Sequence, residues 1–411
     1  MPKNSQKVYL DYAATTPTDS EVLAKIRPFF KTKFGNAMSF HQFGQEAMVA
    51  VDNARYTASE FLNCEEREVV FTSGATESNN TVLKGIVDWY WSEYHKIPHI
   101  IISKIEHDCV LESAEYLKKK KLAQVSYVNV SKEGILKIPE LKKNIKPNTV
   151  LISVMYVNNE IGTIQPIAEI GKFLKQENKK RTKKIYLHSD AVQAINFLNC
   201  QVDYLKVDYL SLSGHKIYGP KGVGALYSSR KAPRVVLMHG GHQEDGKRAG
   251  THNITGIVGL GAALEKALKQ NFVKRGREYE YRQGVEFERL EKLRNYMIDK
   301  ILTEVDKVYL NGSRCFRTPN NVNFTFKNIE GESILLALDL AGIAASTGSA
   351  CSSGSLEPSH VIMAIGQKAE MAHGSVRFTL GKHTKKADID YTVKVLVRVV
   401  NKLRKISPYK R

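Results

Sequence analysis

Cysteine is scarce in this chain and widely scattered. The 411 residues contain five cysteines and no Cys-x-x-Cys pair. The five are Cys64, Cys109, Cys200, Cys315 and Cys351. An odd count at wide spacing argues against a disulfide framework and against a structural zinc site built on cysteine pairs. The pattern is typical of a protein in a reducing compartment, so we expect a cytoplasmic protein.

Long apolar runs are also lacking. The longest, residues 150–157, is far too short to span a bilayer, and the first seven residues contain no apolar signal-peptide core. Glycine and proline number only 28 and 12, which excludes collagen-like and low-complexity chains. With 42% hydrophobic and 25% charged residues, the composition is that of a soluble globular protein. We therefore expect no association with a membrane.

Acidic residues are outnumbered by basic ones, 42 against 61, which gives a net charge of +19. Such a surface attracts anionic partners, including nucleic acids, acidic proteins and phosphorylated ligands. The lysines are dispersed singly or in short clusters such as 118–121, and no long basic arm is interleaved with aromatic residues. We therefore expect that direct nucleic-acid binding is not the main role.

Short apolar runs alternate with helix-length segments between about residues 45 and 265. The expected strands are 68–72, 100–103, 125–130, 150–157, 185–188, 209–212 and 224–227. This alternation predicts an α/β fold with a mainly parallel sheet covered on both faces. Apolar residues at helical spacing over 280–303 predict a connecting helix into a second, smaller domain. That domain is expected to hold strands at 322–326 and 376–380 and a last helix over 387–404.

Two motifs carry small or basic residues next to expected strands. Residues 71–80 place glycine and hydroxyl residues before a helical run, which is typical of a phosphate site or of a simple capped turn. Residues 210–224 place Lys216 after an apolar strand, near His215 and Lys221. Lys216 is either a surface lysine or an amine held in a site, where neighbouring cations would favour Schiff-base chemistry.

Three further motifs have chemical potential. Asp190 follows an expected strand, where it either caps a helix or contacts a ligand ring nitrogen. Residues 344–355 are a run of small residues around Cys351, and this composition predicts a mobile loop with a reactive thiol. The other four cysteines show no sign of more than packing. Residues 239–251 contain two histidines and several glycines, and they favour a phosphate-binding or close-approach loop over a metal site.

Five motifs occur in a fixed order, at residues 10–17, 72–78, 157–162, 213–222 and 348–359. With them the chain closely resembles the cysteine desulfurases of the NifS/IscS group, which are pyridoxal-phosphate (PLP) enzymes of the class-V aminotransferase family. The resemblance runs from about residue 9 to residue 403. It implies the fold-type I PLP arrangement, with a large domain over 15–265. It assigns residues 1–14 and 266–411 to a small domain that carries the cysteine loop at about 344–356.

The resemblance also implies roles for individual residues. Lys216 carries PLP, Asp190 keeps the pyridine nitrogen protonated so that the ring is an electron sink, and His107 stacks on the ring as an acid/base. The implied further cofactor contacts are Ala75, Thr76, Asn159, Gln193, Ser213 and His215, together with Thr251 toward the phosphate of the other subunit of a homodimer.

Substrate binding and sulfur transfer are assigned in the same way. Arg377 clamps the carboxylate of L-cysteine, a bidentate task that suits arginine, and Asn159 assists. Cys351 is the nucleophile that takes the sulfur as a persulfide while L-alanine leaves. No metal site is expected, and Cys351 is the one candidate for a transient iron-sulfur ligand.

The implied activity is therefore that of a PLP-dependent cysteine desulfurase, a sulfurtransferase. Its partners would be an iron-sulfur scaffold protein or an acceptor in a sulfur relay or tRNA thiolation. A selenocysteine lyase, or another PLP-dependent lyase on the same fold, is the alternative enzyme. A scaffold or nucleic-acid-binding protein that has kept the fold is the alternative outside enzymes, and joint retention of Lys216, Asp190, His107 and Cys351 argues against it.

Overall fold

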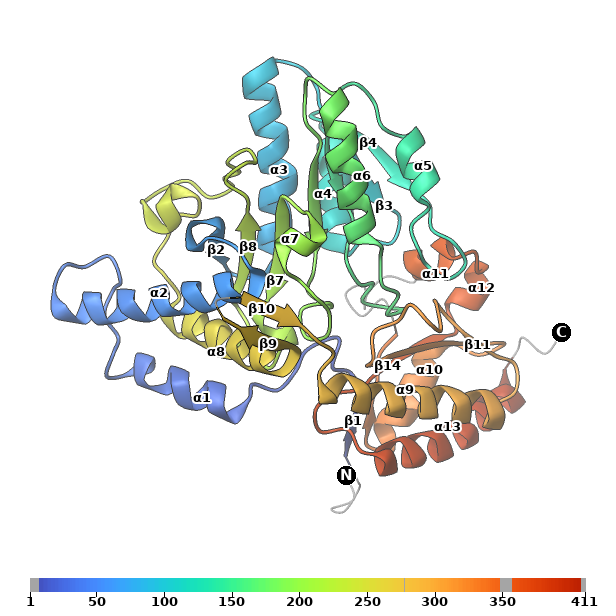
Figure 1. Ribbon diagram of the computed structural model, residues 1–411. Coiled ribbons are helices and arrows are strands. Elements are labelled where there is room, and N and C mark those ends of the chain that lie inside the picture. Colours follow the sequence, from blue (N-terminus) through green and yellow to red (C-terminus); the bar gives the residue numbers. More distant parts are fainter. Residues whose placement is uncertain (1–6, 277, 348–356, 408–411) are drawn as a thin grey trace.

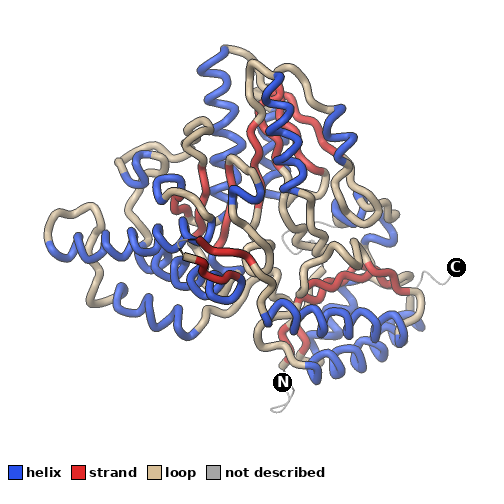
Figure 2. Tube along the Cα trace, viewed as in Figure 1, coloured by secondary structure: helices blue, strands red, loops and turns tan. Residues whose placement is uncertain are grey.

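The computed structural model describes residues 7–276, 278–347 and 357–407. Its first unit is built around a seven-stranded sheet (Figures 1 and 2). In spatial order the strands are β2 (Val69–Thr72), β8 (Gly224–Ser228), β7 (Tyr209–Ser213), β6 (Tyr186–Asp190), β5 (Thr149–Ser153), β3 (His99–Ser103) and β4 (Gln124–Val128). Only β8 runs antiparallel to its neighbours in this sheet. The predicted α/β fold with a mainly parallel sheet is confirmed.

Helices cover both faces of this sheet because its strands are buried on both sides. In β3, Ile101 packs into one hydrophobic cluster, while Ile100 and Ile102 pack into another, as the two-residue period of a strand requires. The second cluster lies under α3 (Ala75–Tyr94) and α4 (Asp108–Lys119). The longer helices that contribute to the first are α2 (Gln42–Leu62), α6 (Ile167–Glu177) and α8 (Ile254–Asn271), and the short helix α7 (Val202–Leu205) contributes as well. Two shorter helices of this unit are α1 (Ser20–Ile26) and α5 (Ile138–Lys143).

Most of the remaining chain forms a second unit around a hydrophobic core of its own. Three antiparallel strands form its sheet, in the order β11 (Val308–Leu310), β12 (Asn321–Phe326) and β14 (Ser375–Thr379). Its helices are α9 (Val285–Glu304), α10 (Gly331–Leu340) and α13 (Lys386–Ile406). The short helices α11 (His360–Ala364) and α12 (Ala369–Ala372) pack in a further cluster with Ile105, Val130 and Met155 of the first unit. Helices α9 and α13 lie side by side beneath this sheet (Figure 1). The amino-terminal strand β1 (Val8–Tyr9) joins this unit by pairing with β13 (Ile343–Ala344).

The connection between the two units differs from the sequence prediction of one helix over 280–303. Helix α9 begins at Val285, and the preceding residues form a hairpin of β9 (Phe272–Arg275) and β10 (Glu278–Tyr281). Phe272 and Tyr281 are paired across the hairpin with ring centroids 5.6 Å apart, and Gly276 takes a φ of +63° at its turn. The cross-strand aromatic pair stabilises this hairpin, whose last two residues, 280 and 281, fall within the predicted helix.

The two cores support a division into two domains, which we propose. Helix α8 runs without a break through residue 265 and buries Ala267 and Leu268 in the core of the first unit. We place the proposed boundary after this helix. Within the part of the chain that the structure describes, no helix combines the length and the apolar character that crossing a bilayer requires.

Candidate active site

A cavity of about 660 Å³ lies at the carboxyl ends of the central parallel strands. Side chains that follow β3, β5, β6 and β7 converge at this edge, which is where open α/β sheets bind ligands. Ten of the twelve predicted site residues line it: Ala75, Thr76, His107, Asn159, Asp190, Gln193, Ser213, His215, Lys216 and Arg377. The sheet topology therefore brings together residues that are up to three hundred positions apart in sequence.

Lys216 lies in this cavity and is not a surface lysine. It ends the short 3-10 turn η4 (Gly214–Lys216) that follows β7. Its Nζ donates hydrogen bonds to the backbone oxygens of Ala13 (2.5 Å) and Ala14 (2.7 Å). The amino-terminal segment thus contacts the amine. Of the two alternatives left open by the sequence, a surface lysine or an amine held in a site, the structure favours the second.

Asp190 is a buried carboxylate at the end of β6. Its side chain accepts hydrogen bonds from Asn79 Nδ2 (2.7 Å) and from the backbone N–H of Val192 (3.0 Å). The chain after Asp190 forms turns and not a helix, so the alternative of a helix cap is wrong. A buried carboxylate held by two N–H donors provides the negative charge that a protonated ring nitrogen requires.

His107 has a defined ring orientation because it caps α4. Its Nδ1 accepts from the backbone N–H of Cys109 at 3.2 Å, and the Sγ of the same cysteine lies 3.1 Å away. Since Nδ1 is the acceptor, the neutral ring carries its proton on Nε2. The protein thereby assigns the two ring nitrogens to different tasks.

The first turn of α3 provides backbone N–H groups at one end of the cavity. Gly74 precedes this helix with a φ of +155°, which only glycine adopts readily, and Ala75 and Thr76 follow it. The first N–H groups of a helix have no partner within the helix and favour anions. Beside this turn, burial, with Lys216 and Lys221 nearby, lowers the pKa of His215 to about 4, so the ring is neutral near pH 7.

Arg377 and Gln193 are positioned by backbone carbonyls. The buried guanidinium of Arg377, on β14, donates to Asn159 O (2.8 Å) and to Asp11 Oδ1 (2.9 Å), and its Nε has no hydrogen-bond partner. The amide of Gln193 donates to Ala13 O at 3.0 Å. The second unit thus contributes an arginine to a cavity built mainly by the first.

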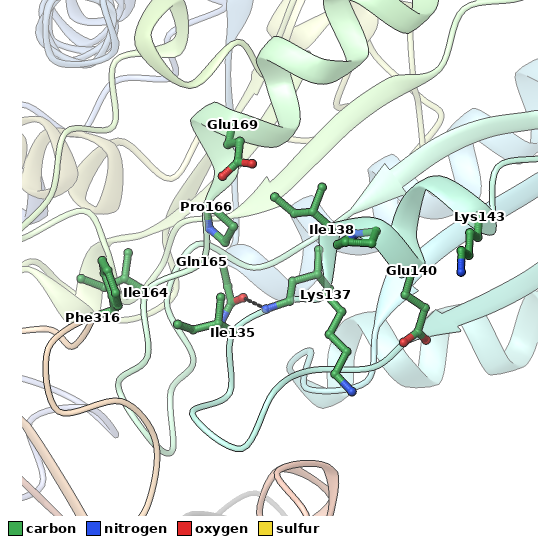
Figure 3. A pocket seen from close by; sticks show the side chains of 12 residues that line it. Ile135, Lys137, Ile138, Glu140, Lys143, Ile164, Gln165, Pro166, Glu169 and Phe316 are labelled. Carbon is green, nitrogen blue, oxygen red and sulfur yellow. Dashed lines mark hydrogen bonds between the residues drawn. The ribbon is translucent and has the colours of Figure 1, made fainter.

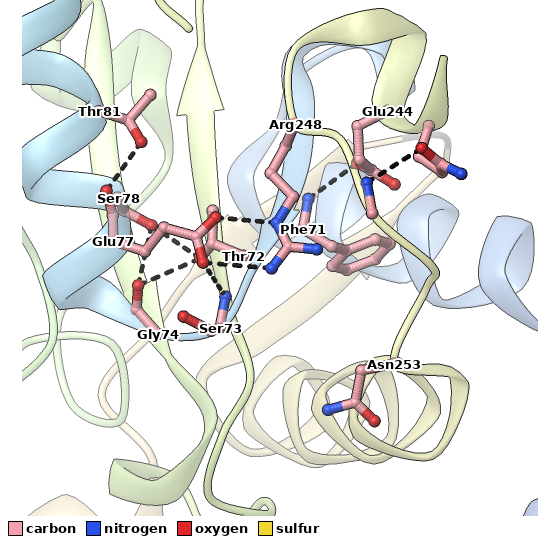
Figure 4. Close-up of polar contacts among 12 residues, drawn as sticks. Phe71, Thr72, Ser73, Gly74, Glu77, Ser78, Thr81, Glu244, Arg248 and Asn253 are labelled. Carbon is pink, nitrogen blue, oxygen red and sulfur yellow. Dashed lines mark hydrogen bonds and ion pairs between the residues drawn. The ribbon is translucent and has the colours of Figure 1, made fainter. Parts of the chain in front are cut away.

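Thr251 lies outside this cavity and is exposed. The loop before it is held by Glu244, whose buried carboxylate accepts from Arg55 (2.7 and 2.8 Å), from His252 Nε2 (2.9 Å) and from the backbone N–H of Phe71 (2.8 Å). In the same loop Arg248 pairs with Glu77 in the first turn of α3 at 2.9 Å (Figure 4). The loop predicted to approach a phosphate is therefore anchored beside that turn.

Cys351 and most of its predicted loop lie outside the described residues, which stop at 347 and resume at 357. The two flanking positions are close to the cavity. Ser346 exchanges backbone hydrogen bonds with Arg377 at 2.6 and 3.1 Å, and Ser359 contacts Glu160, which lines the cavity.

The comparisons with known proteins agree with this arrangement. The model of the family described as "Aminotransferase class-V" matches residues 8–392. The chain belongs to the class-V aminotransferase family.

Relatives in this family have matching lengths. A "Cysteine desulfurase IscS" from Dictyoglomus turgidum is 48% identical over 406 residues, which cover 99% of this chain and 98% of the relative. A human "Cysteine desulfurase" is 42% identical and is covered over 83% of its length, with 98% of this chain matched. A solved "NIFS-LIKE PROTEIN" superposes with a TM-score of 0.86 at 34% identity, covering 97% of this chain and 100% of that one. The structure of "SspA in complex with cysteine" superposes with a TM-score of 0.76 at 35% identity, covering 91% of this chain and 99% of that one.

Enzymes of the class-V aminotransferase family use PLP, and the cavity fits this cofactor. An aldehyde requires an amine, a pyridinium requires a carboxylate and a phosphate requires N–H donors. Lys216, Asp190 and the first turn of α3 supply these three groups around one cavity. The buried Asn79 Oδ1 also has no hydrogen-bond partner, although its Nδ2 holds Asp190.

Several residues of this class-V site were missed in the sequence. Cys109 was expected only to pack, yet it lines the cavity and contacts His107 and Asn79, each at 3.1 Å. Glu106 is fully buried, and this burial raises its pKa to about 8 against the opposing hydrogen bonds from Ser103 and Met155. Burial also raises the pKa of Glu160. In the sequence, these two carboxyls stand out only by position, since Glu106 precedes His107 and Glu160 follows Asn159.

A second cavity, of about 820 Å³, lies apart from this site (Figure 3). It is mostly apolar and is formed by residues 135–143, residues 164–169 and Phe316. None of the described predicted site residues lines it. In the described ranges, no group of three or more histidine, cysteine or acidic side chains is arranged to hold a metal ion.

Proposed function

We propose that this chain is a cysteine desulfurase that removes the sulfur of L-cysteine and releases L-alanine. The observation that carries the proposal is the convergence of Lys216, Asp190, His107 and Arg377 on one cavity. A protein that shared this fold without its catalysis would not need an amine, a carboxylate for the ring nitrogen, an acid/base and a group that binds the substrate carboxylate in one cavity.

In this proposal each side chain has one task. Lys216 holds PLP through its amine, and the buried charge of Asp190 keeps the cofactor nitrogen protonated. When bound, PLP supplies an electron sink for charge that develops on the substrate. Arg377 orients the substrate carboxylate through its guanidinium. His107 delivers or removes a proton through Nε2, because Nδ1 is occupied as the helix cap.

Cys351 completes the reaction as the nucleophile. Its thiolate forms a sulfur–sulfur bond to the substrate thiol as the carbon–sulfur bond breaks. The electron pair goes to the substrate's β-carbon, which is protonated to the methyl group of alanine, and the sulfur stays as a persulfide. A thiolate is required because the thiol is a poor nucleophile.

We further propose that the active protein is a homodimer in which Thr251 reaches the cofactor phosphate of the partner subunit. Thr251 is exposed and does not line its own cavity, so we infer that its contact to a phosphate is made in a second copy. Exposed phenylalanines lie between α1 and α2 at positions 30, 34 and 40 and in the first turn of α2 at position 43, and Phe40 is 96% exposed. An apolar patch of this kind is typical of an interface.

The persulfide sulfur is proposed to serve iron-sulfur cluster assembly, tRNA thiolation or both. The net charge of +19 favours docking of an acidic acceptor protein. We place the protein in the cytoplasm because the described cysteines are all free thiols, and a reducing compartment keeps thiols in this state.

The test is alanine formation from L-cysteine with a reductant present, for the wild type and for Cys351→Ala. The proposal expects alanine from a yellow wild-type protein, and loss of alanine with retention of the PLP absorbance in the variant. A yellow wild-type protein that forms no alanine from L-cysteine would overturn the desulfurase assignment.

A further inference from the structure

The chain re-enters the described structure close to the candidate active site. Residues 348–356 lie outside the description, and Ser359 is the first buried residue after them. Ser359 is 5% exposed although only two residues separate it from that gap. A buried hydroxyl needs a hydrogen-bond partner. The partner of Ser359 therefore shows which part of the protein holds the chain where it leaves residues 348–356.

Ser359 is held by a carboxylate of the site. Its Oγ donates to Glu160 Oε2 at 2.5 Å and accepts from the backbone N–H of Ile362 at 3.2 Å. The hydroxyl therefore both starts α11 and ties that helix to Glu160. The bond satisfies two buried polar groups at once, one on each side of the contact.

Glu160 is itself fixed relative to the cavity. Its N–H donates to Asn158 Oδ1 at 2.9 Å. Its carbonyl accepts from Asn321 Nδ2 (3.1 Å) and from Asn323 Nδ2 (3.0 Å) on β12. The residue before it, Asn159, accepts from Arg377. The backbone of Glu160 is thus held in place with respect to the proposed substrate clamp.

A second tether runs in parallel. His360 Nε2 donates to the backbone oxygen of Glu106 at 3.0 Å, one residue before His107. On the other side of the gap, the backbone pairing of Ser346 with Arg377 holds the preceding segment. Both ends of the undescribed segment are therefore attached to neighbours of the residues proposed to bind substrate.

We infer that Glu160 and Ser359 form a positioning pair that fixes where the segment carrying Cys351 is anchored relative to the bound substrate. This inference rests on the proposed function. Cys351 precedes Ser359 by eight residues in the sequence, so the position of Ser359 sets one end of the chain segment that carries the thiol. A fixed anchor raises the effective concentration of a tethered group at its target. Neither residue touches the reacting atoms, and both act through the segment.

The test is Ser359→Ala in the PLP-loaded enzyme, with Ser359→Thr as the variant that keeps the hydroxyl. Ser359 is the better probe because Glu160 itself lines the cavity. We expect kcat for alanine formation to fall roughly 10- to 100-fold in Ser359→Ala, as misplacement of a reacting group predicts. The KM for L-cysteine and the L-cysteine-induced change in cofactor absorbance should stay at wild-type values. Ser359→Thr should restore kcat.

Ser313→Ala is the matched control. Ser313 is also buried, caps a turn by accepting from Phe316 N (3.1 Å) and donates to a glutamate, Glu133 (3.3 Å), but it is not attached to the segment after 347. Its kcat should remain that of the wild type. An unchanged kcat in Ser359→Ala, an equal fall in Ser313→Ala, or a loss of PLP absorbance in Ser359→Ala would overturn the inference. A wild type that forms no alanine would instead defeat the proposed function.

Discussion

Replacing Glu244 by glutamine should destabilise the protein through the loop that carries Thr251. The carboxylate is almost wholly buried. It accepts hydrogen bonds from the Arg55 guanidinium on α2, from the His252 ring and from the backbone N–H of Phe71 on β2, so it joins three parts of the chain. Glutamine keeps the size and one oxygen but removes the charge. Arg55 then remains buried without its counter-charge, which is the costly way to break such a pair.

The magnitude follows from the pKa of this carboxyl. The hydrogen bonds from Arg55 and His252 lower the pKa of Glu244 from 4.5 to about 2, although burial alone would raise it. A difference of about 2.5 pKa units corresponds to about 3 kcal/mol at pH 7. Because the folded-state pKa is the lower one, this stability is fully present above the unfolded pKa of 4.5 and is lost as the pH falls through 2.

The assay is thermal unfolding of wild type and variant at several pH values. At pH 7 the variant should melt roughly 6 °C lower, at about 2 °C per kcal/mol for a domain of this size. The gap should narrow as the pH falls below 4.5. Glu265→Gln is the control, because its pairs with Lys25 and Lys269 are exposed and contribute at most about 1 kcal/mol. A gap that is absent at pH 7, or that does not change with pH, would refute the reasoning.

Four further outcomes follow. Lys216→Ala should remain folded but lose the PLP absorbance and alanine formation together, as spectroscopy and the alanine assay would detect; colour retained at wild-type strength would contradict the assigned anchor. Arg377→Lys should raise KM for L-cysteine roughly 10-fold or more, because an ammonium cannot make the two-point contact; an unchanged KM would remove the clamp. His188 is buried between Ser153 and Ser211, and burial lowers its pKa to about 3. The unfolded chain binds this proton below pH 6.5, so the wild type should lose about 1.4 kcal/mol per pH unit from there toward 3. In His188→Gln, the free energy of unfolding should depend less steeply on pH between 6.5 and 3. A pH dependence as steep as that of the wild type would contradict this role of His188. Phe40→Asp should shift the protein to monomers in size-exclusion chromatography, and a dimer of unchanged stability would place the interface elsewhere.

The sequence predicted the sheet well because its strands are buried on both faces. Runs such as 150–157 are apolar at every position but Ser153, and a parallel sheet covered on both faces accommodates several of them. The hairpin of β9 and β10 was missed because its stabilising aromatic pair joins Phe272 and Tyr281 across the strands, which no local pattern shows.

For the site, the ordered motifs and the family resemblance that they carry supplied the residues, while position after a strand left Lys216 and Asp190 open between two roles. Lys216, Asp190 and His107 each follow a strand, and the topology then brings them to one edge. The contacts of Glu160 with Ser359 and of Lys216 with Ala13 join residues about two hundred positions apart, and no local pattern encodes them. Cys109 was underestimated because a cysteine in a helix is usually core, and only the cap geometry of His107 places it at the cavity.

The most direct measurement of the central claim is mass spectrometry of the peptide that contains Cys351, after one turnover with L-cysteine and without reductant. The account predicts one added sulfur atom on Cys351, formed in step with one alanine per active site. Alanine formed without sulfur on Cys351, or with the sulfur on Cys109 beside His107, would contradict it.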